Sequence, residues 1–149
     1  METITLQQGL SKTSPARLIR QAVFVEEQGF ANEFDDTDAI AWHIVLSVDG
    51  EPAACGRTFP KEGCDGTYII GRVAVLPPFR GRRVGRMLMG ALEAQAQKLG
   101  AQKIELSAQE QAMGFYQKLG YQAVGDLYND EHCPHMLMVK TLSGGEADE

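Results

Sequence analysis

The chain has 149 residues, a length typical of one domain with a substantial core. Hydrophobic residues make up 44% and charged residues 23%, as in ordinary globular proteins, and no run approaches the roughly 18 apolar residues of a membrane span. The formal net charge of -6 excludes a general attraction for nucleic acid. We therefore expect a single domain over residues 1–142 and a disordered acidic tail over 143–149.

The cysteines and the N-terminal residues indicate the cellular compartment in which the protein is expected. Cys55, Cys64 and Cys133 are odd in number and lack the pair spacing of zinc ligands, which favours free thiols in a reducing environment. Residues 1–5 have neither the basic start nor the apolar core of a signal peptide. We expect a cytoplasmic protein that holds no metal and has neither membrane nor nucleic acid as a partner.

The first half of the chain predicts a strand, a helix and three strands. Residues 3–6 are a short strand candidate. Ser14 before Pro15 is typical of a helix N-cap and first turn, and an apolar stripe that includes Leu18 continues to about Gln28. An acidic, turn-rich stretch follows. The next three strands are predicted over residues 42–48, 52–58 and 67–76.

The second half predicts a helix, a strand, a shorter helix and two strands. Apolar residues recur at helical spacing from Met87 to Leu99. Residues 103–107 alternate like a strand, 110–119 read as a helix, and strands are predicted around 121–127 and 135–141. This order of elements predicts an α/β (α+β) fold, in which helices flank a mixed central sheet.

A cationic glycine loop separates the strand that ends near Leu76 from the long helix. Two prolines after Leu76 cannot donate to a sheet ladder. Unpaired amides and the dipole at the following helix start favour an anion, so the loop predicts a phosphate site. The alternatives are a solvated basic loop and a patch that pairs with the protein's own carboxylates. The cations of the loop are Arg80, Arg82, Arg83 and Arg86.

This loop resembles the signature of the GNAT superfamily of acetyl-CoA-dependent N-acetyltransferases. That signature is Arg or Gln, two residues, Gly, one residue, then Gly or Ala. Arg80 and Gly85 fill its first and last positions, whereas Arg83 replaces the middle glycine. Residues 72–75 are similar to the family's fourth strand, and residues 114–121 to its late helix and turn that carry a tyrosine.

Four further stretches resemble a bacterial subgroup of small, largely uncharacterised acetyltransferases. They are residues 23–28, 35–38, 107–109 and 134–135. The resemblance covers about residues 3–142. It implies the GNAT-like acyl-CoA N-acyltransferase fold, whose mostly antiparallel sheet is splayed between its fourth and fifth strands.

The resemblance implies that acetyl-CoA lies in this opening. The pantetheine arm would hydrogen-bond to the backbone of Val73 and Val75 like an added strand, and the pyrophosphate would lie on the loop amides. The residues implied to bind acetyl-CoA are Val73, Ala74, Val75, Arg80, Gly81, Arg82, Arg83, Val84, Gly85, Arg86, Ser107, Ala108, Phe115, Tyr116 and Lys118.

The same resemblance implies catalytic roles. Tyr116 would supply a proton to the CoA thiolate, the alternative being a plain core residue. The backbone amide of Val73 would stabilise the oxyanion. Residues 69–71, where many relatives carry a base, offer no group that accepts a proton. Besides a water chain, the candidate bases are His135, His43, Glu27 and Glu33.

Arg72, Glu33 and Asp35 are the candidates for acceptor binding. Arg72 either orients an anionic group of the acceptor or neutralises a buried carboxylate. The acidic residues around Asp35 are either a solvated face or attract a cationic amine. The leading hypothesis is acetyl transfer to a primary amine of a small molecule or peptide, by direct attack in a ternary complex. The alternative is a non-catalytic acyl-CoA-binding sensor. An exposed sheet edge is compatible with a homodimer.

Overall fold

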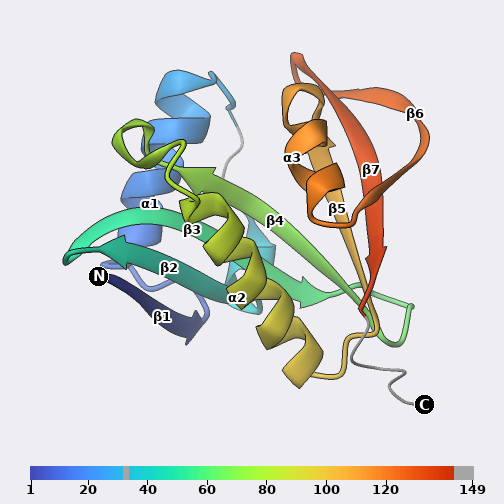
Figure 1. The fold of residues 1–149 in the computed structure, drawn as a ribbon, viewed down its shortest axis with the longest axis horizontal. Helices are drawn as coiled ribbons and strands as arrows, with labels where there is room; N and C mark the ends of the chain where they lie inside the picture. Colours follow the sequence, from blue (N-terminus) through green and yellow to red (C-terminus); the bar gives the residue numbers. More distant parts are fainter. Residues whose placement is uncertain (32–33, 143–149) are drawn as a thin grey trace.

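The structure is a computed structural model, and it describes residues 1–31 and 34–142. In these residues seven strands form one sheet in the order β1-β2-β3-β4-β5-β7-β6 (Figure 1). Neighbouring strands are antiparallel except β4 and β5, which are parallel. The mixed, mostly antiparallel sheet is thereby confirmed. The strands are β1 (Glu2–Gln8), β2 (Trp42–Val48), β3 (Glu51–Pro60), β4 (Thr67–Val75), β5 (Lys103–Gln109), β6 (Gln122–Asp130) and β7 (Cys133–Thr141).

Helices cover both faces of the sheet, as expected. Helix α2 (Val84–Lys98) lies across one face (Figure 1), and α3 (Met113–Lys118) contributes to the same apolar core. Helix α1 (Pro15–Arg20) packs against β3 and contributes Ala16 and Ile19 to a second apolar core. Ala54 belongs to the first core and Cys55 to the second, and successive strand residues point to opposite faces, so the two cores lie on opposite sides of the sheet. No helix in the described residues is long and apolar enough to cross a membrane.

The helix predicted up to about Gln28 is confirmed in extent, but it changes type along its length. Ser14 Oγ accepts a hydrogen bond from the amide of Ala16 at 3.2 Å, as its N-cap position predicts. After α1 the chain continues as the π-helix η1 (Gln21–Glu27). The expectation that Leu18 lies on the buried stripe is wrong, because Leu18 is 76% exposed and this short helix turns its other side to the sheet.

A bulge in β4 lies beside its parallel pairing with β5. Arg72 and Val73 of β4 together oppose only Gly56 of β3, and Arg72 has a φ of 52°. Pairing with β5 is limited to residues 67–69 of β4 and 103–105 of β5. Beyond them the two strands separate (Figure 1), which confirms the splay that the resemblance implies.

Gly56 brings α2 close to the sheet opposite this bulge. A Cβ on Gly56 would lie 2.6 Å from Leu92 Cδ1 and 3.3 Å from Val73 Cγ2. Both distances are shorter than ordinary van der Waals contact. Glycine at this position therefore lets α2 pack directly over the bulged strand.

Candidate active site

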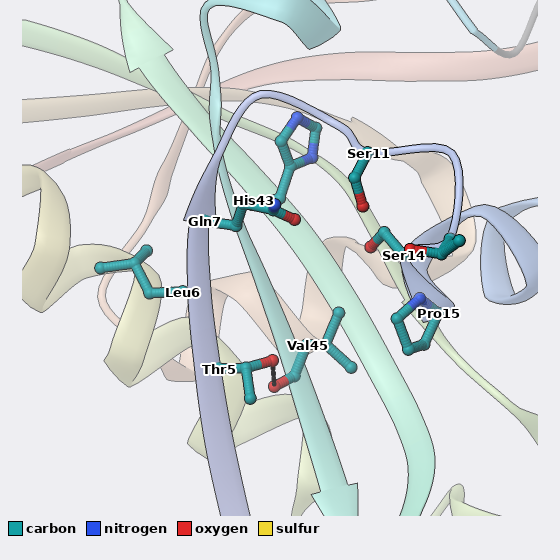
Figure 2. A pocket seen from close by; sticks show the side chains of 9 residues that line it. Thr5, Leu6, Gln7, Ser11, Ser14, Pro15, His43 and Val45 are labelled. Atoms are coloured by element: carbon teal, nitrogen blue, oxygen red, sulfur yellow. Dashed lines mark hydrogen bonds between the residues drawn. The ribbon is translucent and has the colours of Figure 1, made fainter.

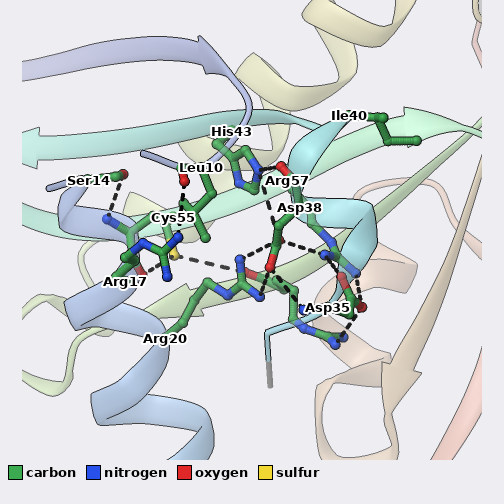
Figure 3. Close-up of polar contacts among 12 residues, drawn as sticks. Leu10, Ser14, Arg17, Arg20, Asp35, Asp38, Ile40, His43, Cys55 and Arg57 are labelled. Atoms are coloured by element: carbon green, nitrogen blue, oxygen red, sulfur yellow. Dashed lines mark hydrogen bonds and ion pairs between the residues drawn. The ribbon is translucent and has the colours of Figure 1, made fainter. Parts of the chain in front are cut away.

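A network of ion pairs attaches the acidic turn around the short 3-10 helix η2 (Asp36–Ala39) to α1 and β3 (Figure 3). Arg20 Nη1 and Arg57 Nη1 donate to Asp38 Oδ1 at 2.8 and 2.7 Å. Burial disfavours the charged carboxylate, but the two guanidinium groups outweigh it and lower the pKa of Asp38 to about 2. Of the two alternatives for the acidic residues, the solvated face is therefore wrong for Asp38, which is a structural ion-pair partner.

Asp35 extends the network toward β4. Its carboxylate accepts hydrogen bonds from Arg57 Nη1 at 2.7 Å and from Arg72 Nη2 at 3.2 Å. The hydrogen bond from Arg57 lowers the pKa of Asp35 by more than burial raises it. Arg72 thus pairs with one of the protein's own carboxylates, on the acidic turn. Glu33 lies outside the described residues.

A cavity of about 520 Å³ lies between β4, the start of α2 and α3. At the start of α2, Met87 is the first residue whose amide has a backbone carbonyl partner among the described residues, Arg83 O at 3.1 Å. The amides of the preceding turn are left for a ligand, which favours an anion here. The cavity is lined by Val73, Val75, Phe79, Arg80, Gly81, Arg83, Val84, Gly85, Arg86, Ala112, Phe115, Tyr116, Lys118 and Leu119.

The cations of this cavity are of two kinds. Arg83, Arg86 and Lys118 have no ion-pair partner within the described ranges 1–31 and 34–142. Arg80, by contrast, holds Glu27 through two hydrogen bonds of 2.7 and 2.8 Å and donates from Nε to a β4 carbonyl. Arg83 enters α2 with a φ of 63°, so the residue that replaces the signature glycine adopts the left-handed conformation. Free amides and three available cations fit a polyphosphate.

Other residues implied to bind the cofactor lie outside this cavity. Ala74 and Ala108 are buried in the two cores. The guanidinium of Arg82 lies 5.3 Å from the centre of the Phe79 ring. Ser107 lines a second cavity.

The second cavity, of about 480 Å³, lies on the opposite side of the splay. Its apolar walls come from η1, the turn that follows it, β3 and β4, and its polar groups come mainly from β5, β7 and the turn before β7. The lining residues are Phe24, Phe30, Arg57, Phe59, Ile69, Ile70, Gly71, Arg72, Ser107, Gln109, Ala112, Tyr116, Asp130, Glu131 and His135.

Tyr116 lines both cavities. The rings of Phe115 and Tyr121 lie edge-on to it at 5.0 and 5.9 Å. Burial raises the pKa of Tyr116 to about 12, and among the described residues its hydroxyl has no hydrogen-bond partner. The structure therefore places a protonated phenol where the two cavities meet.

The remaining candidate bases lie in different surroundings. Glu27 is held by Arg80, whose hydrogen bonds lower the pKa of Glu27. His43 lies in a separate hollow beside β1, with Ser11 and Ser14 nearby (Figure 2). Its Nε2 contacts the Asp38 carbonyl at 3.0 Å, and burial lowers the pKa of His43. Of the described candidates, only His135 lines a cavity that Tyr116 shares.

Comparison with known proteins agrees with this geometry. A family model described as the acetyltransferase (GNAT) family matches residues 11–121. The chain belongs to the GNAT acetyltransferase family. Family membership makes it an acyltransferase with acyl-CoA as its co-substrate.

The relatives include two Bacillus subtilis proteins and two solved structures. YyaT, named an uncharacterized protein, is 35% identical over 130 residues, which are 84% of this chain and 86% of YyaT. YjcF, named an uncharacterized N-acetyltransferase, is 36% identical over 125 residues, 82% and 87% of the two chains. The structure of Escherichia coli ElaA has a TM-score of 0.84 at 27% identity, covering 94% of this chain and 99% of ElaA. An acyl-CoA N-acyltransferase from Pseudomonas aeruginosa has a TM-score of 0.83 at 26% identity, covering 95% and 100%.

Proposed function

We propose that this protein transfers an acetyl group from acetyl-CoA to a primary amine of a small molecule or peptide, by direct attack in a ternary complex. The observation that carries the proposal is the position of Tyr116. Its side chain lines both the cavity with the phosphate-binding features and the cavity on the other side of the splay. A donor and an acceptor bound in these cavities would meet beside one phenol.

The residues present supply the elements of this reaction. The amides at the start of α2, with Arg83, Arg86 and Lys118, bind the phosphates. The bulge at Arg72 and Val73 interrupts pairing with β3, and the Val73 amide polarises the acyl carbonyl. Tyr116 retains its proton because its pKa is raised, and it donates that proton to the sulfur that leaves.

Direct attack is favoured over a covalent relay on an enzyme thiol. Cys55 is buried in the α1 core, Cys64 is exposed in a turn, and Cys133 precedes the part of β7 that faces the second cavity. None of the three cysteines lines either cavity. A relay would need a thiolate within reach of the acyl carbon.

Two measurements test the proposal. Acetyl-CoA or CoA at 100 times its dissociation constant adds about 2.7 kcal/mol to stability, so the melting temperature should rise by several degrees, whereas ATP should have little effect. Thiol release is then followed with an amino sugar, a polyamine, an amino acid and a peptide with a free amino terminus. Release that depends on one of these amines supports the proposal. A shift with acetyl-CoA and no release with any amine would favour the non-catalytic acyl-CoA-binding sensor.

A further inference from the structure

We propose that His135 is the general base that takes the proton from the acceptor amine. The inference rests on the proposed function, because a base is needed only if an amine attacks the acyl group. Ile69, Ile70 and Gly71 offer no group on β4 that accepts a proton. The base must therefore reach the second cavity, where the acceptor is proposed to bind, from another element.

The hydrogen bonding of His135 leaves one ring nitrogen available. His135 lies on β7 opposite Gln109 of β5, and both side chains line the second cavity with Tyr116. Nδ1 lies 2.8 Å from the Cys133 carbonyl oxygen. A carbonyl only accepts, so Nδ1 carries the proton and Nε2 carries a lone pair. In the described parts of the chain Nε2 has no hydrogen-bond partner.

Aromatic packing fixes the plane of the imidazole. The Tyr128 ring is stacked on it at 6.1 Å with an interplanar angle of 28°, and the Phe30 ring lies edge-on at 6.3 Å. Tyr128 is itself held to β5 by a hydrogen bond between its hydroxyl and Ser107. His135 is 5% exposed, so its ring is oriented by packing before any acceptor binds.

The other charged groups around the cavity are less suited to accept the proton. Arg57 and Arg72 are cations, and Asp35 beside them is held by both and has a lowered pKa. Glu131 Oε1 accepts a hydrogen bond from the amide of Ala31 at 3.0 Å. Asp130 lines the cavity and is the carboxylate that competes most directly with His135.

The reaction balances with His135 and Tyr116 as a pair. The amine nitrogen forms a bond to the acyl carbon, and the carbon–sulfur bond breaks with its electron pair going to sulfur. His135 Nε2 takes one proton from the nitrogen, and the Tyr116 hydroxyl gives one proton to the sulfur. Solvent then removes the proton from His135 and returns one to Tyr116, so the enzyme is restored.

The substitution His135→Asn tests this role. The amide nitrogen of asparagine can take the place of Nδ1 and donate to the Cys133 carbonyl, but no atom replaces Nε2. With the amine that gives the fastest thiol release, we expect kcat to fall about 100-fold near neutral pH in a variant that remains folded at the assay temperature. A base accepts a proton only in its uncharged form, so acidification should lower wild-type kcat, and this acid limb should be absent from the variant.

Two control variants separate the alternatives. His132→Asn removes a neighbouring exposed imidazole that lines neither cavity but whose ring lies 5.0 Å from that of Phe30, and kcat should change far less than in His135→Asn. Asp130→Asn should keep the acid limb of the pH profile. Loss of that limb in Asp130→Asn, together with its retention in His135→Asn, would assign the base to Asp130 and overturn the proposal.

An acceptor-independent measurement completes the test. Long-range proton–nitrogen spectra of the free protein should show His135 with its proton on Nδ1, and a proton on Nε2 would overturn the proposal whether or not an acceptor is found. If no amine releases thiol while the Nδ1 tautomer is present, the proposed transfer fails and the geometry of His135 stands. If an amine is acetylated and His135→Asn keeps the wild-type profile, only the role of His135 fails.

Discussion

Tyr116 shows how burial specifies the chemistry of one residue. An exposed phenol would begin to ionise near pH 10, whereas burial raises the pKa of Tyr116 to about 12. The side chain therefore stays protonated wherever the protein is expected to work. This is the state that a proton donor to a thiolate requires.

We predict that Tyr116→Phe leaves the affinity for acetyl-CoA nearly unchanged and lowers kcat about 100-fold. The ring stays and keeps its contacts with Phe115 and Tyr121, and only the hydroxyl is removed. Binding is measured by thermal shift and turnover by thiol release. Turnover at the wild-type rate would remove Tyr116 from the mechanism.

The raised pKa of Tyr116 predicts a second, independent result. Because the group loses its proton only around pH 12, its ionisation should not reduce kcat between neutral pH and about pH 10. Ultraviolet difference titrations of wild type and Tyr116→Phe should coincide throughout that interval. A tyrosine that titrates in this interval in wild type and not in the variant would contradict the burial argument.

At the scale of elements, the loop before α2 combines two requirements. It must present amides to a ligand, and it must leave room for that ligand beside α3. Gly85 serves the second requirement, because a Cβ there would lie 3.3 Å from Phe115 Cζ. Gly85→Glu should abolish the thermal shift with acetyl-CoA, since it adds both bulk and negative charge at the anion site.

The control for Gly85→Glu is Gly90→Glu, a glycine of the same helix around which a Cβ would meet nothing within 4 Å. It should keep the thermal shift with acetyl-CoA. Normal binding by Gly85→Glu would show that the phosphates lie elsewhere.

Local sequence signals predicted the helices and strands well. Features that depend on residues far apart in the sequence were predicted poorly. Ser14 and Pro15 marked the start of α1, and β2 has the predicted bounds. The π-helix that follows α1 and the positive φ of Arg72 have no local signal. The cavity at α2 was predictable because its loop is one contiguous motif. The second cavity was not, because its walls come from strands, helices and turns far apart in the sequence.

At the scale of the whole molecule, one buried carboxylate joins three segments. Asp38 connects its own turn to Arg20 on α1 and Arg57 on β3. Sequence patterns did not predict this connection, since its partners are 18 and 19 residues away and an acidic turn is usually solvated. The same network includes Arg57, which lines the second cavity.

We predict that Asp38→Asn lowers the free energy of unfolding by about 3–5 kcal/mol, because two buried guanidinium groups lose a charged partner. The melting temperature should fall by roughly 6–20 °C. The control Asp36→Asn changes an exposed neighbour and should have little effect. Equal melting temperatures for the two variants would show that the buried pairs contribute little.

The same carboxylate predicts the acid stability of the protein. The pKa of Asp38 is about 2 in the folded state and near 3.8 when unfolded, so the folded form binds the proton less readily. Its contribution to stability is present above about pH 4 and is lost as the pH falls toward 2. Thermal melts across this range should show a steep loss in wild type and a shallower one in Asp38→Asn.

The bulge in β4 also determines which changes this strand can accept. Ile70 and Ala74 are four residues apart and would share a face in a regular strand, yet Ile70 packs in the core beneath α2 and Ala74 in the core beneath α1. The bulge, and with it the separation of β4 from β5, thus depends on the number of residues between Ile70 and Ala74 more than on the identity of those residues. Shortening this segment by one residue would restore regular pairing with β3 and remove the bulge, while Ile70, Val73 and Ala74 would keep their present faces. The protein should therefore tolerate many substitutions in this segment, but no deletion.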